Sequence, residues 1–102
     1  MDDPTFQKRA DQALQQLFDA LNAQDFEADF VAGALTIEFE DQKTRFVVSP
    51  NSPVRQIWLS ANVKSFKLDW NEERGQFCLD AKDLNEVVAG QISALLGEKV
   101  EL

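Results

Sequence analysis

The chain has 102 residues, which is enough for one domain with a single hydrophobic core but too few for two. Its 18 acidic and 10 basic residues give a formal net charge of −8, which argues against nucleic acids and anionic membranes as partners. This charge suits cations or basic protein surfaces, with simple solubility as the alternative explanation. The absence of histidine and the single cysteine, Cys78, exclude histidine-dependent triads, histidine-ligated zinc and an intrachain disulfide. With no secretory signal pattern and no apolar run near the ~20 residues that span a bilayer, we expect a cytoplasmic protein.

Apolar residues recur at helical spacing in two segments, one near each end of the chain. Asp3 and Pro4 predict an N-cap followed by the first helical residue, and the pattern continues to Asn22. A second helix is predicted from Asp83, and Gly97 is well placed to end it. The sequence therefore predicts a helix at each end.

Between these helices the hydrophobic period is two, which is typical of half-buried strands. Residues 49–53 contain two prolines and are predicted to form a rigid loop, and residues 61–64 a second loop. The six predicted strands span residues 25–30, 35–40, 45–48, 55–60, 65–70 and 76–79.

This order of elements predicts an α+β fold in one domain covering residues 1–102. We expect both terminal helices to pack on one face of an antiparallel sheet of about six strands, leaving the other face open to solvent. If Ile57 and Leu59 face the helices, Gln56 and Trp58 lie on the open face. An exposed large aromatic commonly anchors a partner. Two alternatives are that a neighbouring loop covers Trp58 or that the parity is reversed.

Acidic side chains follow the polar side of the first helix and of the first two strands. A two-residue turn at 32–33 would place Glu27 opposite Glu38 and Asp25 opposite Glu40, where like charges destabilise a sheet unless a cation binds. Carboxylates suit iron as well as calcium, magnesium and manganese. A solvated polar surface without metal is the alternative. The candidate metal ligands are Asp11, Asp19, Asp25, Glu27, Asp29, Glu38 and Glu40.

Residues 53–60 resemble the most characteristic motif of the frataxin family. Residues 33–37 and Asp69-Trp70 fit the second and fifth strands of that family, and the likeness spans nearly the whole chain. Residues 49–51 depart from it, because Ser-Pro-Asn stands where the family has Asn-Lys-Gln. The residues that match the family pattern Pro-x-x-Gln-Ile-Trp-Leu-Ser/Ala are Pro53, Gln56, Ile57, Trp58, Leu59 and Ser60.

The resemblance implies a frataxin-like α–β sandwich that binds iron, as Fe²⁺ or Fe³⁺, weakly on an acidic ridge along the first helix and first strand. It also implies contacts with a cysteine desulfurase and with the iron–sulfur cluster scaffold protein through the sheet face around the tryptophan. The candidate partner-binding residues are Asn51, Gln56, Trp58 and Lys67.

The expected role is therefore that of a non-enzymatic accessory protein of iron–sulfur cluster assembly, either as iron donor or as regulator of the desulfurase. We expect a monomer, with iron-driven oligomerisation left open, in a bacterial cytoplasm or, for a eukaryotic chain, in the mitochondrial matrix. An acidic interaction module without metal is one alternative. A ferroxidase is another, disfavoured because the chain has no histidine and no di-iron motif. Cys78 is predicted to pack as a small side chain rather than to act in redox chemistry.

Overall fold

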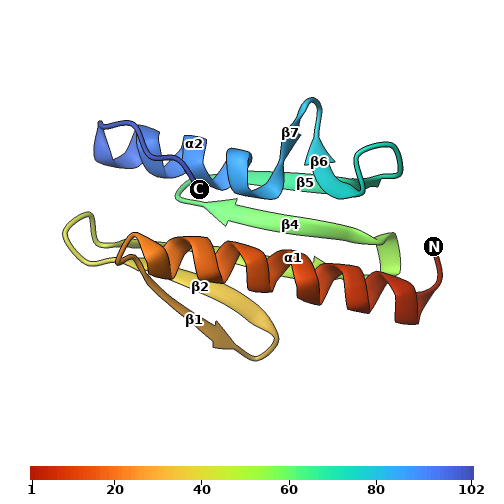
Figure 1. Cartoon of the computed structure of the whole chain (residues 1–102). Helices are drawn as coiled ribbons and strands as arrows, with labels where there is room; N and C mark the ends of the chain where they lie inside the picture. The colour runs from red at the N-terminus through yellow and green to blue at the C-terminus, as the bar shows by residue number, and fades with distance from the viewer.

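The computed structural model of the chain describes all 102 residues and has two layers, a sheet and a pair of helices. The seven strands form an antiparallel meander in which each strand pairs with the next, in the order β1-β2-β3-β4-β5-β6-β7. Both helices lie side by side on one face of this sheet (Figure 1). The elements are α1 (Asp3–Ala23), β1 (Glu27–Val31), β2 (Ala34–Phe39), β3 (Thr44–Asn51), the 3₁₀ turn η1 (Ser52–Val54), β4 (Gln56–Ala61), β5 (Lys64–Asn71), β6 (Gln76–Leu79), β7 (Lys82–Asp83) and α2 (Leu84–Leu96).

This architecture confirms the predicted α+β fold with both helices on one face. The prediction missed β7, since a strand of two residues is too short to show an alternating pattern. No helix of the chain is both long enough and apolar enough to cross a membrane.

Helix α1 begins one residue earlier than the sequence predicts. Asp2, rather than Asp3, is the N-cap, and its carboxylate accepts a hydrogen bond of 2.9 Å from the backbone N–H of Thr5. That hydrogen bond lowers the pKa of Asp2 from its usual 3.8. The prediction failed because two successive aspartates offer the same cap, and Asp3 is used instead in an ion pair with Arg55.

Helix α2 has the ends that its sequence predicts. Asp83 caps the helix, and Glu86 completes a capping box by accepting from the backbone N–H of Asp83. Gly97 ends the helix in the left-handed conformation with φ 71°.

The core fills the space between the two helices and the inner face of the sheet. All buried side chains are apolar, so no charged group requires a partner there. α1 supplies one buried residue per turn, and β2, β3 and β4 supply alternate residues, as the two periodicities require. The core comprises Phe6, Ala10, Leu14, Leu17, Leu21, Leu35, Ile37, Phe39, Phe46, Val48, Ile57, Leu59, Ala61, Leu68, Phe77, Leu84, Val87, Val88, Ile92 and Val100.

The chain after α2 is also part of this packing. The C-terminus lies between the two helices (Figure 1), and the side chain of Val100 is only 9% exposed. The backbone N–H of Val100 donates to Ser93 Oγ at 2.9 Å, and Gln24 Nε2 donates to the carbonyl of Glu101. These contacts attach the C-terminal segment to the ends of both helices.

The predicted loop at 49–53 is wrong, because β3 continues through its first three residues. Ser49, Pro50 and Asn51 pair with Trp58, Ile57 and Gln56 of β4. The pairing of β3 with β2 ends at Val48. Beyond that point β3 is locally an edge strand, which is where a sheet accepts a proline.

Candidate functional site

The open face of the sheet brings the predicted partner-binding residues together. Ile57 and Leu59 are buried toward the helices, whereas Trp58 between them is half-buried on the opposite face, which confirms the predicted parity. The register places Asn51 opposite Gln56 and Trp58 opposite Lys67. All four predicted residues therefore lie on neighbouring positions of β3, β4 and β5.

A chain of two hydrogen bonds holds the indole of Trp58 in place. Trp58 Nε1 donates to Gln56 Oε1 at 2.9 Å, and Gln56 Nε2 donates to Asp69 Oδ1 at 3.0 Å. Since one end of the Gln56 amide accepts and the other donates, Asp69 determines which way the amide faces. The Trp58 N–H is thus satisfied within the chain, and the indole is held in one orientation before any partner arrives.

The ammonium group of Lys67 lies over the same indole, 4.9 Å from the ring centroid. None of the ion pairs of the chain involves Lys67, so its charge remains available at the surface. An ordered aromatic beside an unpaired cation is suited to recognising another protein, because little side-chain entropy remains to be lost on binding.

The sequence did not identify Asp69 as part of this face. Alternation shows that Asp69 and Lys67 share one side of β5, but not which residues of β4 they meet. That depends on the β4–β5 hairpin, where Ala61 pairs with Lys64 and only Asn62 and Val63 form the turn. The loop predicted for 61–64 is therefore too long by two residues.

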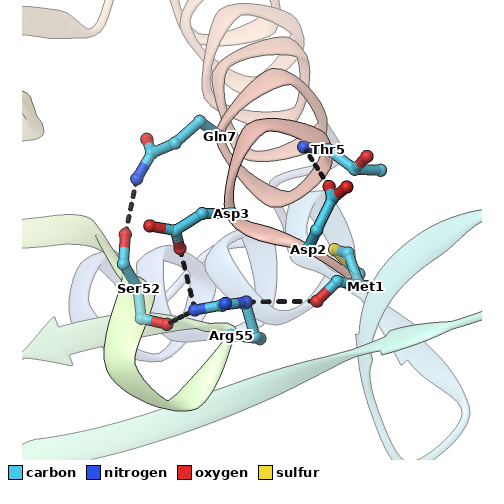
Figure 2. A network of polar contacts seen from close by, with 7 residues as sticks. All are labelled: Met1, Asp2, Asp3, Thr5, Gln7, Ser52 and Arg55. Carbon is cyan, nitrogen blue, oxygen red and sulfur yellow. Dashed lines mark hydrogen bonds and ion pairs between the residues drawn. The ribbon is translucent and has the colours of Figure 1, made fainter.

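The N-terminus of the chain clamps the connection that leads into β4 (Figure 2). Arg55, predicted as the first residue of the strand, instead adopts a left-handed conformation with φ 54° at the end of η1. Its guanidinium is 2.8 Å from Asp3 Oδ1 and donates to the backbone carbonyls of Met1 and Ser52. Gln7 Nε2 also donates to Ser52 Oγ. These contacts link α1 to the residue that precedes Gln56, so they help to set where β4 begins.

The seven predicted metal ligands are all exposed, and the structure brings one predicted pair together. Glu27 lies directly opposite Glu38, as the two-residue turn at Ala32 and Gly33 requires. Asp25 has φ 63° and lies outside β1, so the predicted pairing of Asp25 with Glu40 is wrong. Glu38 faces Arg45 on its other side, which partly offsets the repulsion.

The other predicted ligands are spread over three elements: Asp11 and Asp19 lie on α1, Asp29 lies on β1, and Glu40 lies in the turn that follows β2. The rings of Phe18 and Phe30 lie 5.2 Å apart, which fixes the helix beside the edge strand. Asp11 lines a hollow next to Gly33, at the turn that ends β1, whereas Asp25 precedes the start of β1. No group of three or more Asp, Glu, His or Cys side chains is arranged to hold one metal ion. The acidic ridge, defined by the seven predicted carboxylates, therefore offers scattered oxygen ligands.

Cys78 is buried on β6, opposite Asp69 of β5 and Asp83 of β7. Burial raises the pKa of its thiol, so the uncharged form is favoured at neutral pH. This environment is that of a packed side chain, because nucleophilic chemistry requires the thiolate.

The fold and the open face together define a small two-layer α+β protein whose uncovered sheet surface carries an ordered tryptophan. The sequence model of the frataxin-like domain matches residues 1–98 of the chain. The chain therefore belongs to the frataxin family.

Relatives of known name match over most of their length. The iron–sulfur cluster assembly protein CyaY of Dechloromonas aromatica is 32% identical over 105 residues, covering 100% of this chain and 99% of the relative. The protein of the same name from Pseudomonas putida strain W619 is 33% identical over 92 residues, covering 88% of this chain and 82% of the relative. A solved frataxin structure from Psychromonas ingrahamii is 25% identical and superimposes with a TM-score of 0.84, covering 99% of this chain and 97% of that one.

Proposed function

We propose that this chain is an accessory protein of iron–sulfur cluster assembly that acts by docking its open sheet face on the assembly machinery. The names of its relatives and their nearly complete coverage support the pathway. The observation that carries the docking proposal is the ordered Trp58, fixed by Gln56 and Asp69 and overlaid by Lys67. Tryptophan is among the residues most enriched at the hot spots of protein interfaces.

The proposed partners are a cysteine desulfurase and the scaffold protein on which clusters are built. Two surfaces of different chemistry support contact with two partners. The open face at β3–β5 offers an aromatic and an unpaired cation, whereas the acidic ridge on α1, β1 and β2 attracts basic protein surfaces. In this arrangement the chain regulates the desulfurase, donates iron to the scaffold protein, or does both.

Iron is proposed as cargo held loosely on the acidic ridge. Exposed carboxylates are hard ligands suited to ferrous and ferric ions, and a cation beside Glu27 and Glu38 relieves their mutual repulsion. A site of this kind discriminates poorly among metals and releases them readily. These properties suit delivery better than storage.

We further propose that the chain has no catalytic activity of its own. A di-iron ferroxidase gathers several carboxylates around both ions, whereas the acidic ridge of this chain is dispersed along α1, β1 and β2. Oxygen uptake in the presence of ferrous iron and the chain should therefore equal that of ferrous iron alone. Faster uptake would favour the ferroxidase alternative.

The test of the docking proposal is the affinity of the chain for each purified partner, measured by calorimetry at low and high salt. Trp58→Ala should weaken binding at least tenfold, since an aromatic hot spot contributes ~2 kcal/mol or more. Val63→Ala, which trims another apolar side chain that is 91% exposed, is the matched control and should bind normally. Unchanged binding of Trp58→Ala would refute the proposal. If the complexes of the unmodified chain and of Trp58→Ala both dissociate at high salt, the result would favour an interaction module that binds by charge alone.

A further inference from the structure

A hollow of about 220 Å³ lies on the open face directly beside Trp58. It arises because a row of small side chains runs across the sheet next to the row that contains the large indole. The surface is therefore lower over the small side chains than over the indole. The first row is Ser49, Trp58 and Lys67, and the second is Val47, Ser60 and Ser65.

The hollow has the size and lining of a side-chain receptor. Its volume exceeds the ~150 Å³ of a cavity that accommodates a benzene molecule, so one leucine, isoleucine or methionine side chain fits. The indole of Trp58 forms one wall, and Val47 lines the hollow from the adjacent row. Because Trp58 is fixed by Gln56, this wall is already in place in the free protein.

The rim of the hollow is rich in hydrogen-bond donors. Lys67 has no carboxylate partner within the chain, and Ser60 and Ser65 are exposed. The indole N–H is not among the free donors, since Gln56 occupies it. A carboxylate is the acceptor that best complements an unpaired ammonium group and serine hydroxyls.

The charge distribution of the chain determines how such a partner is oriented. The chain carries −8 overall, and the acidic ridge on α1, β1 and β2 repels a carboxylate, whereas Lys67 attracts one. An acidic group of the partner is therefore directed to Lys67 and the neighbouring Ser65 on β5, away from both β1 and Asp69. Repulsion on one side and attraction on the other give specificity as well as affinity.

From these features we infer that the hollow receives one aliphatic side chain of a partner-protein segment in which that residue neighbours an aspartate or glutamate. The aliphatic group packs against Trp58, and the carboxylate pairs with Lys67 and the serine hydroxyls. This inference rests on the proposed docking function and specifies the chemistry of the partner that the face recognises.

The inference is tested by filling the hollow while Trp58 stays intact. Ser60→Leu and Ser65→Leu place a branched side chain in the space, and both positions are exposed, so the fold is retained, as thermal unfolding will verify. Affinity for the desulfurase and for the scaffold protein is measured by calorimetry. Each variant should weaken, at least tenfold, binding to the same partner that Trp58→Ala weakens. Gln42→Leu, which adds the same side chain in the exposed β2–β3 turn, is the matched control and should bind normally.

The carboxylate is tested separately at Lys67. Lys67→Glu should weaken binding more than Lys67→Gln, because reversal adds repulsion to the lost attraction, and the difference should shrink at high salt. Equal effects of the two variants would overturn the acidic part of the inference.

The outcomes separate this inference from the function on which it rests. If Trp58→Ala weakens binding but neither leucine variant does, the docking function stands and the hollow is not a receptor. If Trp58→Ala has no effect, the docking function itself fails. If the free chain dimerises at high concentration and Ser65→Leu abolishes the dimer, the occupant is a second copy and the inferred partner is wrong.

Discussion

The most informative perturbation is the removal of the carboxylate that orients the docking face, Asp69→Ala. Asp69 is not one of the proposed partner contacts. Its carboxylate accepts a hydrogen bond of 3.0 Å from Gln56, and Gln56 accepts one of 2.9 Å from the indole N–H of Trp58. The variant therefore leaves the aromatic in place and removes only its support. Its effect measures how much of the affinity comes from pre-ordering.

The expected loss of binding free energy follows from the side chains that the substitution releases. Ordering one flexible side chain on binding costs about 0.5–1.5 kcal/mol, and Asp69→Ala frees two, Gln56 and Trp58. Since all three residues are at least partly exposed, solvent competes for these hydrogen bonds and the lower end applies. A loss of about 1 kcal/mol corresponds to a roughly fivefold weaker complex.

Calorimetric titration with the partner that Trp58→Ala affects is the assay, and Asp69→Asn is the conservative variant. The asparagine side chain keeps a carbonyl acceptor for Gln56, so the affinity of this variant should lie between those of the alanine variant and the unmodified chain. Asp41→Ala, which removes another exposed carboxylate in the β2–β3 turn, controls for the change in net charge. If Asp69→Ala binds as tightly as the unmodified chain while Trp58→Ala does not, the hydrogen bonds of Asp69 and Gln56 do not contribute to affinity by pre-ordering Trp58.

Three further predictions concern stability. Val100→Ala should lower the free energy of unfolding by about 1–3 kcal/mol in urea titrations, because it removes two buried methyl groups; an unchanged midpoint would show that the C-terminal segment is not docked. The pKa of Asp2 is lowered in the folded state, so its contribution to stability is present above the unfolded value of 3.8 and is lost as the pH falls through the folded value. Asp2→Asn keeps a capping side chain without its charge, so its Tm should fall less steeply with decreasing pH than that of the unmodified chain. An identical fall in Tm at acid pH would show that the charge of Asp2 does not stabilise the helix end. Glu27→Gln should raise the free energy of unfolding by about 0.2–1 kcal/mol, because it removes the like charge opposite Glu38. The same variant should reduce the rise in Tm that ferrous iron causes under anaerobic conditions. An undiminished rise in Tm would place the cation elsewhere.

Local patterns in the sequence were sufficient for the fold and for the parity of the site. The two amphipathic stripes determine the helices, and the alternation of Ile57, Trp58 and Leu59 is enough to assign the tryptophan to the open face. Gly33 beside Ala32 allows the tight turn that places Glu27 opposite Glu38. These features depend on residues within one helix or one hairpin, where spacing alone fixes the geometry.

Features that join distant segments could not be predicted in the same way. The clamp of Arg55 depends on Met1 and Asp3, which are more than 50 positions away, and it accounts for the choice of Asp2 as the N-cap. The extension of β3 through Pro50 depends on β2 ending early, which makes that part of β3 an edge. In each case the sequence offers several local solutions and a remote contact selects one.

The sequence by itself determined the α+β order, the inner and outer faces of the strands and the residues with a chemical part to play. Only the tertiary structure decided which of those residues act together. The β4–β5 turn brings Lys67 to Trp58 and Asp69 to Gln56, and the pairing of β3 with β4 sets the small residues beside the indole that create the hollow. A side chain's face follows from its own strand, whereas its neighbours follow from the register between strands, and a slip of two residues would keep every face while replacing every neighbour.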